Sequence, residues 1–266
     1  MREPSENADP SGLHGWLSEV YFGALLSGAW EQLARRLGLR ASVDDPLFGS
    51  AAGAELPRYL ADIAARLAAA EATFDRTQFT LGTDRDVTEG ILEMQRGGNR
   101  VAVPVGIVSV RRPAREIAMR LYFDAERLGG TRSARASLLP AAVHASVPPA
   151  VAAHLRAMNR GDIDAVVASF EAGGRVEDSR GNSYVKDSPN NDVRDYYARI
   201  FKSSPRGITW NNGGRADDGR VCALEYRVDV AEESGVGSNS GLAVYQLGEN
   251  GLLHALRMYG DGERFG

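Results

Sequence analysis

The sequence RLYFDAERLG at residues 120–129 returns as RMYGDGERFG at residues 257–266. Most of the paired positions hold the same residue, and the arginine, tyrosine, aspartate and glutamate stay in register. A match of this kind at a fixed offset indicates that a structural unit has been duplicated within one chain.

A second correspondence lies upstream of the first. Gly28 and Gly161 are each followed by an apolar helical run, and an aspartate stands 17 residues after each glycine, Asp45 in one case and Asp178 in the other. Two internal matches in the same order predict two homologous modules rather than one large domain.

The organisation that follows from these repeats has four parts. We expect a disordered tail over residues 1–10, a first module over 11–129, a linker over 130–147 and a second module over 148–266. The linker is rich in serine, alanine and arginine and is followed directly by two prolines, Pro148 and Pro149, which is typical of an exposed connection.

Each module is expected to begin with helices and to continue with strands. In the second module, Gly161 is placed to end a first helix and Asp162 to cap the next, while period-two alternation sets in after Cys222. The predicted helices lie near 13–27, 30–37, 55–74, 151–160, 163–170 and 193–201, and the predicted strands near 77–81, 87–95, 101–110, 115–123, 222–230, 242–247 and 252–259. Asp178 is assigned to a loop. This is an α+β plan, in which helices cover one face of a curved antiparallel sheet and form a cone with an internal pocket.

Composition excludes several classes of protein. A formal net charge of -4 and a pI of about 5.7 argue against a general nucleic-acid binder, which needs a basic face. The single cysteine, Cys222, permits no internal disulfide. We find no run of apolar residues long enough for a membrane span, no signal peptide, no zinc-ligand spacing and no phosphate-binding loop. We therefore expect a cytoplasmic protein without metal or other cofactor.

The two matching aspartates, Asp45 and Asp178, are the first candidate site residues. A carboxylate in an apolar pocket can exchange protons at neutral pH and serve as a general acid or base. The alternative is that each aspartate only caps a helix or a turn, which is a common use of this residue type.

The sequence around these aspartates resembles a known family. VEDSRG at 176–181 and DVRDYYA at 192–198 resemble the signature of ketosteroid isomerases and SnoaL-like polyketide cyclases, ASVDDP at 41–46 resembles the same signature, and LEY at 224–226 resembles a strand of that family. The resemblance covers both modules and implies two cone-shaped domains of the NTF2-like superfamily. It is specific for the fold and not for the reaction, since this fold hosts several enzyme classes and plain binding domains.

The resemblance implies roles for particular residues. Asp45 and Asp178 match the general base of the isomerases. The oxyanion tyrosine of that family lies 24 residues before the base, where this chain has Tyr21 in the first module and His154 in the second. A histidine can still donate a hydrogen bond. The alternatives are that Tyr21 is an ordinary amphipathic-helix residue and His154 a surface histidine.

The chain also departs from the isomerase pattern. The second oxyanion acid of that family falls near Val105 and Leu242, where no acid is present. On the last strand of each module, Asp124 and Asp261 match the acid/base aspartate of SnoaL-like cyclases and limonene-type epoxide hydrolases. Arg120 and Tyr122 share their face in the first module, and we expect Tyr122 and Tyr259 to contact substrate. The alternative is that an arginine–aspartate pair on this face braces the two modules.

The resulting hypothesis is a cofactor-independent acid/base enzyme of secondary metabolism. It would act as a polyketide cyclase, an isomerase or an epoxide-opening hydrolase on an apolar, oxygenated small molecule. The alternative is a small-molecule-binding or scaffold protein whose pockets have lost catalysis. In either case we expect a small-molecule partner, no nucleic acid and no membrane, and an internal pseudo-dimer, which is compatible with a monomeric chain.

Overall fold

The computed structural model describes residues 13–130, 146–203, 208–232 and 235–260. The first module contains α1 (Leu17–Leu26), α2 (Trp30–Leu37), β1 (Ser42–Asp45), β2 (Gly49–Ala52), α3 (Leu56–Ala69), β3 (Thr73–Leu81), β4 (Arg85–Arg96), β5 (Asn99–Arg112) and β6 (Glu116–Tyr122), with the 3₁₀ turns η1 (Gly53–Glu55), η2 (Pro113–Arg115) and η3 (Ala125–Leu128). The second module contains α4 (Pro149–Arg160), α5 (Ile163–Ala168), β7 (Phe170–Glu177), β8 (Ser183–Val185), α6 (Val193–Ser203), β9 (Ile208–Asp217), β10 (Val221–Glu232), β11 (Gly235–Leu247) and β12 (Leu253–Gly260).

The two modules share one topology, which confirms the α+β prediction of two helix-covered, cone-like units. The strand order is β2-β1-β6-β5-β4-β3 in the first sheet and β8-β7-β12-β11-β10-β9 in the second. Consecutive long strands pair antiparallel, whereas β1 with β6 and β7 with β12 form one parallel pair in each sheet. The sheets are therefore mixed, and the parallel pair places Asp45 and Asp178 at corresponding strand ends.

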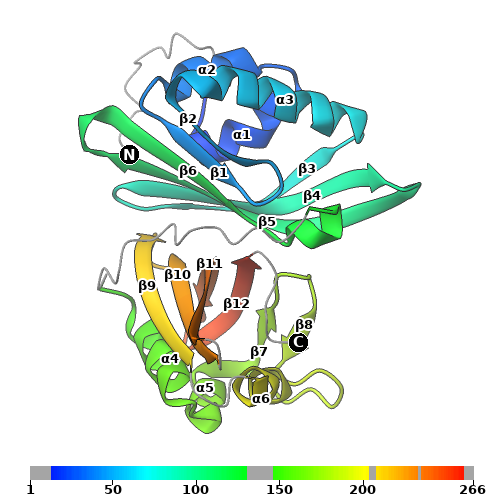
Figure 1. Ribbon diagram of the computed structural model, residues 1–266. Coiled ribbons are helices and arrows are strands. Elements are labelled where there is room, and N and C mark those ends of the chain that lie inside the picture. Colours follow the sequence, from blue (N-terminus) through cyan, green and yellow to red (C-terminus); the bar gives the residue numbers. More distant parts are fainter. Residues whose placement is uncertain (1–12, 131–145, 204–207, 233–234, 261–266) are drawn as a thin grey trace.

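Helices and sheets form four layers in which the sheets are innermost. Helices α1–α3 cover the outer face of the first sheet and α4–α6 cover the outer face of the second, so the two uncovered faces meet in the middle of the molecule (Figure 1). The space between each sheet and its helices is filled by an apolar core, one for each module. A third apolar cluster lies between the sheets, with Tyr122 and Val108 from one module and Leu242 and Tyr259 from the other.

Local signals in the second module act as the sequence predicts. Gly161 adopts the left-handed conformation at φ 65° that ends α4, and the Asp162 side chain accepts a hydrogen bond from the Ala165 amide at 3.0 Å to begin α5. The prediction that this helix reaches Phe170 is wrong, because α5 ends at Ala168 and Phe170 opens β7. The predicted tail and most of the predicted linker lie outside the described residues.

Two buried glutamates connect the sheets in a pseudo-symmetric way. Glu225 of β10 accepts hydrogen bonds from both Nε and Nη2 of Arg120 at 2.6 Å each, and from the Tyr122 hydroxyl at 2.7 Å. Conversely, Glu89 of β4 accepts from Nε of Arg257 at 2.6 Å and from the Tyr259 hydroxyl at 2.7 Å. Each module thus offers an arginine and a tyrosine from its last strand to a glutamate of the other.

Candidate functional site

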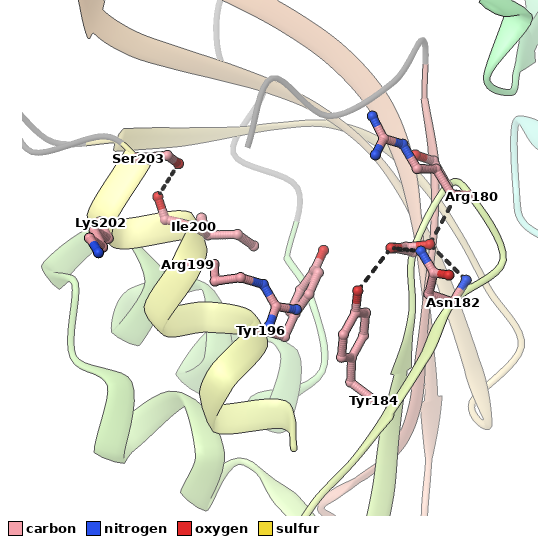
Figure 2. Close-up of a pocket in the computed structure, with 10 residues that line it drawn as sticks. Arg180, Asn182, Tyr184, Tyr196, Arg199, Ile200, Lys202 and Ser203 are labelled. Carbon is pink, nitrogen blue, oxygen red and sulfur yellow. Dashed lines mark hydrogen bonds between the residues drawn. The ribbon is translucent and has the colours of Figure 1, made fainter. Parts of the chain in front are cut away.

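A pocket of about 450 Å³ opens in the second module beside Asp178. One wall is the turn between β7 and β8, and the opposite wall is helix α6 (Figure 2). The lining residues are Asp178, Ser179, Arg180, Asn182, Tyr184, Tyr196, Arg199, Ile200, Lys202 and Ser203. Its volume is in the range of small-molecule sites, which run from about 300 to 1,000 Å³.

The carboxylate of Asp178 is held by four hydrogen bonds. Its Oδ1 accepts from the backbone amides of Arg180 at 3.0 Å and Asn182 at 2.8 Å, and its Oδ2 accepts from the Asn182 side-chain amide at 2.9 Å and the Tyr184 hydroxyl at 3.3 Å. A carboxylate offers about four lone-pair positions. The bonds to Arg180 and Asn182 are those of a turn-forming aspartate, so this residue has a structural role in addition to any chemical one.

Two tyrosines form the aromatic part of the pocket. The rings of Tyr184 and Tyr196 lie 4.6 Å apart between centroids, and the Arg199 guanidinium lies 5.1 Å from the Tyr184 ring centroid, a cation–π distance. Burial raises the pKa of the Tyr184 hydroxyl, and the negative charge of Asp178 raises it further. Tyr184 therefore stays protonated at neutral pH and can donate its proton to Asp178.

The first module contacts the turn that carries Asp178. Oδ2 of Asp124 lies 3.9 Å from Nε of Arg180, and the Arg127 guanidinium donates to the Arg180 carbonyl. Oδ1 of Asp124 accepts the Glu126 amide at 3.1 Å and so caps η3. The predicted acid/base residue Asp124 thus lies at the junction of the modules and supports the site in the second one.

His154 lies in the core of the second module, 1% exposed, rather than on the surface. The Ser169 hydroxyl donates to the Val166 carbonyl at 2.5 Å, so at Nδ1 of His154 it acts as the acceptor, at 3.0 Å, and the proton sits on Nδ1. Nε2 then accepts from the Tyr197 hydroxyl at 3.3 Å. Burial lowers the pKa of His154 to about 3. A neutral ring whose Nε2 has no proton cannot donate to an oxyanion from that atom. The cavity beside this ring measures only about 10 Å³.

Tyr21 and Asp45 lie together in the core of the first module. The Tyr21 hydroxyl is fully buried and has no hydrogen-bond partner among the described residues. Its pKa is raised well above 10, first by burial and then by the negative charge of Asp45. Oδ1 of Asp45 accepts the amides of Leu47 at 2.7 Å and Phe48 at 3.0 Å. Asp45 therefore forms a turn, as Asp178 does, and its carboxyl group lies near the tyrosine.

The remaining candidates fall outside the two helix-covered cores. The hydroxyls of Tyr122 and Tyr259 donate hydrogen bonds across the sheet interface to Glu225 and Glu89, respectively. Tyr259 also borders a pocket of about 300 Å³ between the modules. Asp261 lies outside the described residues.

The two positions at which the second oxyanion acid of the isomerases was expected, Val105 and Leu242, lie in different surroundings. Val105 belongs to the core of the first module, whereas Leu242 belongs to the cluster between the sheets. The residue opposite Tyr122 on β5 is Gly106 and the one opposite Tyr259 on β11 is Leu242, so the equivalence of these strands is shifted by one residue.

Sequence reasoning missed four residues that shape these sites. Tyr184 and Arg199 form the pocket, and Glu89 and Glu225 hold the modules together. For Glu225 a signal was present, since it lies in the LEY segment that resembles a strand of the family. The described part of the chain contains no group of His, Cys, Asp and Glu side chains placed to hold a metal ion. Nor do its helices combine the length and apolarity that a membrane span requires.

Comparison with known proteins finds no matching family model and no matching curated protein. Among solved structures, the epoxide hydrolase/cyclase-like enzyme SalBIII of pyran ring formation in the polyether salinomycin is 19% identical with a TM-score of 0.36, covering 42% of this chain and 88% of its own. A putative polyketide cyclase from Sinorhizobium meliloti is 16% identical with a TM-score of 0.34, covering 42% and 94%.

A third solved structure has a ketosteroid isomerase-like fold. This hypothetical protein from Catenulispora acidiphila is 13% identical with a TM-score of 0.37, covering 43% of this chain and 86% of its own. NTF2-like and ketosteroid isomerase-like proteins, the groups that the sequence resembles, are thus found among the similar structures, and each of these matches has the length of one module.

Proposed function

We propose that the chain is a cofactor-independent acid/base enzyme for an apolar, oxygenated small molecule, with its site in the pocket beside Asp178. The observation that carries this proposal is the hydrogen bond from the Tyr184 hydroxyl to Asp178 Oδ2 at the pocket wall. Of the donors to this carboxylate, the hydroxyl is the one that can pass a proton on, because the others are amide N–H groups.

The proton relay that follows runs through Tyr184. A substrate C–H or O–H proton moves to the Tyr184 oxygen while the Tyr184 proton moves to Asp178, which becomes a neutral acid. The reverse sequence returns the proton to another atom of the substrate. Isomerisation, ring closure and epoxide opening all need such a step, and general acid–base catalysis contributes about 10²–10⁴ in rate.

A binding protein is the second candidate, and one observation favours it. Three of the four bonds to Asp178 are turn bonds that fix the carboxylate whether or not a substrate is present. In this alternative the pocket holds a ligand and no proton moves.

The two candidates differ in proton exchange. We would incubate the protein with 2-tetralone, a readily enolised ketone, in D₂O and follow loss of the α-proton signals by NMR. Accelerated exchange that Asp178→Asn and Tyr184→Phe both reduce by about 10²-fold or more supports the enzyme. Saturable binding of 2-tetralone without acceleration supports the binding protein. Glu249→Gln, in an exposed turn, is the matched control.

We also propose that the two modules serve as an internal dimer, so that the chain functions as a monomer. The paired contacts of Glu225 and Glu89 support this arrangement. Sedimentation of the purified chain at the mass of one copy is the expected result, and a stable two-copy species would contradict it.

A further inference from the structure

Two positive charges at the pocket have no acidic partner within the described residues. Arg199 and Lys202 both belong to α6 and line the pocket, and neither forms an ion pair with a described residue. The Arg199 side chain is directed toward Tyr184, and Lys202 lies at the end of the helix farther from that tyrosine (Figure 2). Arg180 lies across from them, and its distance of 3.9 Å to Asp124 is long for an ion pair. Since unpaired arginine and lysine side chains at a pocket wall attract anions, the charge of this pocket favours a negatively charged ligand.

The charge of Asp178 does not cancel this preference. Asp178 is the acidic residue that lines the pocket, but its two carboxylate oxygens already accept four hydrogen bonds. Arg199 is directed over the Tyr184 ring and not toward that carboxylate. An anion bound by Arg199 and Lys202 would therefore sit on the α6 side of the pocket, apart from Asp178.

A buried serine hydroxyl at the pocket is a second, independent feature that indicates a ligand oxygen. Ser179 is 2% exposed, borders the same pocket, and its hydroxyl has no hydrogen-bond partner among the described residues. Nearly all buried polar side-chain atoms in native proteins have such a partner. A hydroxyl or carbonyl oxygen of a bound molecule would supply it.

Between these polar groups the pocket is apolar. The ring of Tyr196, 3% exposed, and the side chain of Ile200, 1% exposed, lie between the cationic end and the β7–β8 turn. These two side chains offer an apolar surface to a ring, next to Arg199, whose guanidinium lies over the Tyr184 ring.

We infer that the ligand of this pocket is an apolar ring compound that carries a carboxylate, bound by Arg199 and Lys202, and a second oxygen directed at Ser179. This inference rests on the proposed function, since it names the chemical class that the same site takes. Because Arg199 contacts the Tyr184 ring from the α6 side, the carboxylate would lie on that side of the tyrosine, where it anchors the molecule and is not the reacting group.

The test compares two probes of nearly equal shape, 2-naphthoate and its neutral amide, 2-naphthamide, by isothermal titration calorimetry on the full chain. We expect the carboxylate to bind about tenfold tighter, corresponding to about 1.4 kcal/mol. The preference should shrink when NaCl rises from about 20 to about 200 mM, because salt screens exposed charges.

Variants distinguish the loss of the two pocket cations from a general loss of folding. The double variant Arg199→Gln/Lys202→Gln should abolish the preference and leave 2-naphthamide binding within a few-fold of wild type. Arg194→Gln is the matched control, since Arg194 lies on the same helix, pairs with Asp164 and does not line the pocket. Circular dichroism melting curves establish that each variant is folded.

Each outcome decides the inference. A tighter carboxylate whose advantage is lost in the double variant but kept in Arg194→Gln supports it. If the amide binds as tightly as the carboxylate, or the double variant keeps the preference, the anionic class is wrong while the pocket remains a ligand site. If neither probe binds, the proposed small-molecule site falls together with it.

Discussion

Replacing Glu225 by glutamine should weaken the contact between the modules more than any other single charge removal at that interface. Glu225 is 1% exposed and receives Arg120 twice, Arg85 at 2.8 Å and Tyr122. Both arginine side chains are themselves largely buried, with 8% and 11% exposure. The substitution leaves Arg120 without an anionic partner among the described residues, whereas Arg85 keeps Asp84, which accepts from its Nε at 3.0 Å and from its Nη2 at 2.9 Å.

The magnitude follows from this burial. Removing one partner of a buried ion pair costs about 3–5 kcal/mol, because the remaining charge stays desolvated. Glutamine keeps one oxygen that can accept a guanidinium bond, so we expect the lower end, about 3 kcal/mol. For a chain of this size that lowers the melting temperature by about 6–12 °C. Glu89→Gln should cost less, since the arginine that it leaves unpaired, Arg257, is 15% exposed whereas Arg120 is 8% exposed.

The dependence on pH gives a second readout of the same residue. Burial acts to raise the pKa of Glu225, but the charges of Arg120 and Arg85 and the hydrogen bonds from Arg120 and Tyr122 outweigh it and lower the pKa. Its stabilising contribution is therefore present above the ordinary carboxyl value of 4.5 and is lost as pH falls through the lowered value. Glu225→Gln should flatten the acid limb of the stability curve below about pH 4.5.

Urea unfolding at pH 7 measures the free energy of unfolding of wild type, Glu225→Gln, Glu89→Gln and the exposed control Glu249→Gln. The control should lie within about 0.5 kcal/mol of wild type. If Glu225→Gln loses no more stability than this control, the buried ion cluster does not hold the modules together and the reasoning above is refuted.

Two further predictions follow from other residues. Because burial lowers the pKa of His154 to about 3, the folded chain binds fewer protons than the unfolded chain below the ordinary value of 6.5. Stability should therefore fall by about 1.6 kcal/mol between pH 6.5 and 5, a fall that urea unfolding should find reduced in His154→Leu, with His14→Gln as the control for removal of a histidine. Asp124→Asn removes the charge that faces Arg180, and should weaken 2-naphthamide binding in the second module by a few-fold while changing stability by less than about 1 kcal/mol, since Arg180 is half exposed; unaltered binding would show that the first module does not support the pocket.

The parts of the fold that local signals specify could be predicted from the sequence. Gly161 and Asp162 mark a helix boundary by their own backbone and side-chain chemistry, and the alternation after Cys222 marks a strand without reference to the rest of the chain. The short strand β1 could not be predicted in this way. Its four residues, two of them acidic, show no apolar alternation, and they pair both with the short strand β2 and with β6, which is more than 70 residues away.

The functional arrangement depended on contacts that no local pattern contains. In the alternating strand around residue 225, polar side chains point to the face opposite the core, which in an isolated domain would meet water. Here that face meets the sheet of the first module, so Glu225 is buried and its partners come from the other module. The packing of one sheet on the other also explains the positions of Tyr122 and Tyr259. The sequence places them on one face with Arg120 and Arg257, and this face lies between the sheets and not in the cores under the helices.

The two modules make equivalent contacts at their interface but differ in the residues around their candidate sites. The arginine–tyrosine–glutamate contacts occur in both directions, because a pair of like sheets that meet face to face needs the same contacts twice. The site carries no such constraint. Tyr21 keeps an unpartnered hydroxyl near Asp45, while its counterpart His154 is held by Ser169 and Tyr197. In the second module, the turn that bears Asp178 is contacted at Arg180 by Asp124 and Arg127 of the first module. One module can thus change its chemistry while the other supports it, provided that the buried glutamates and their partners are retained.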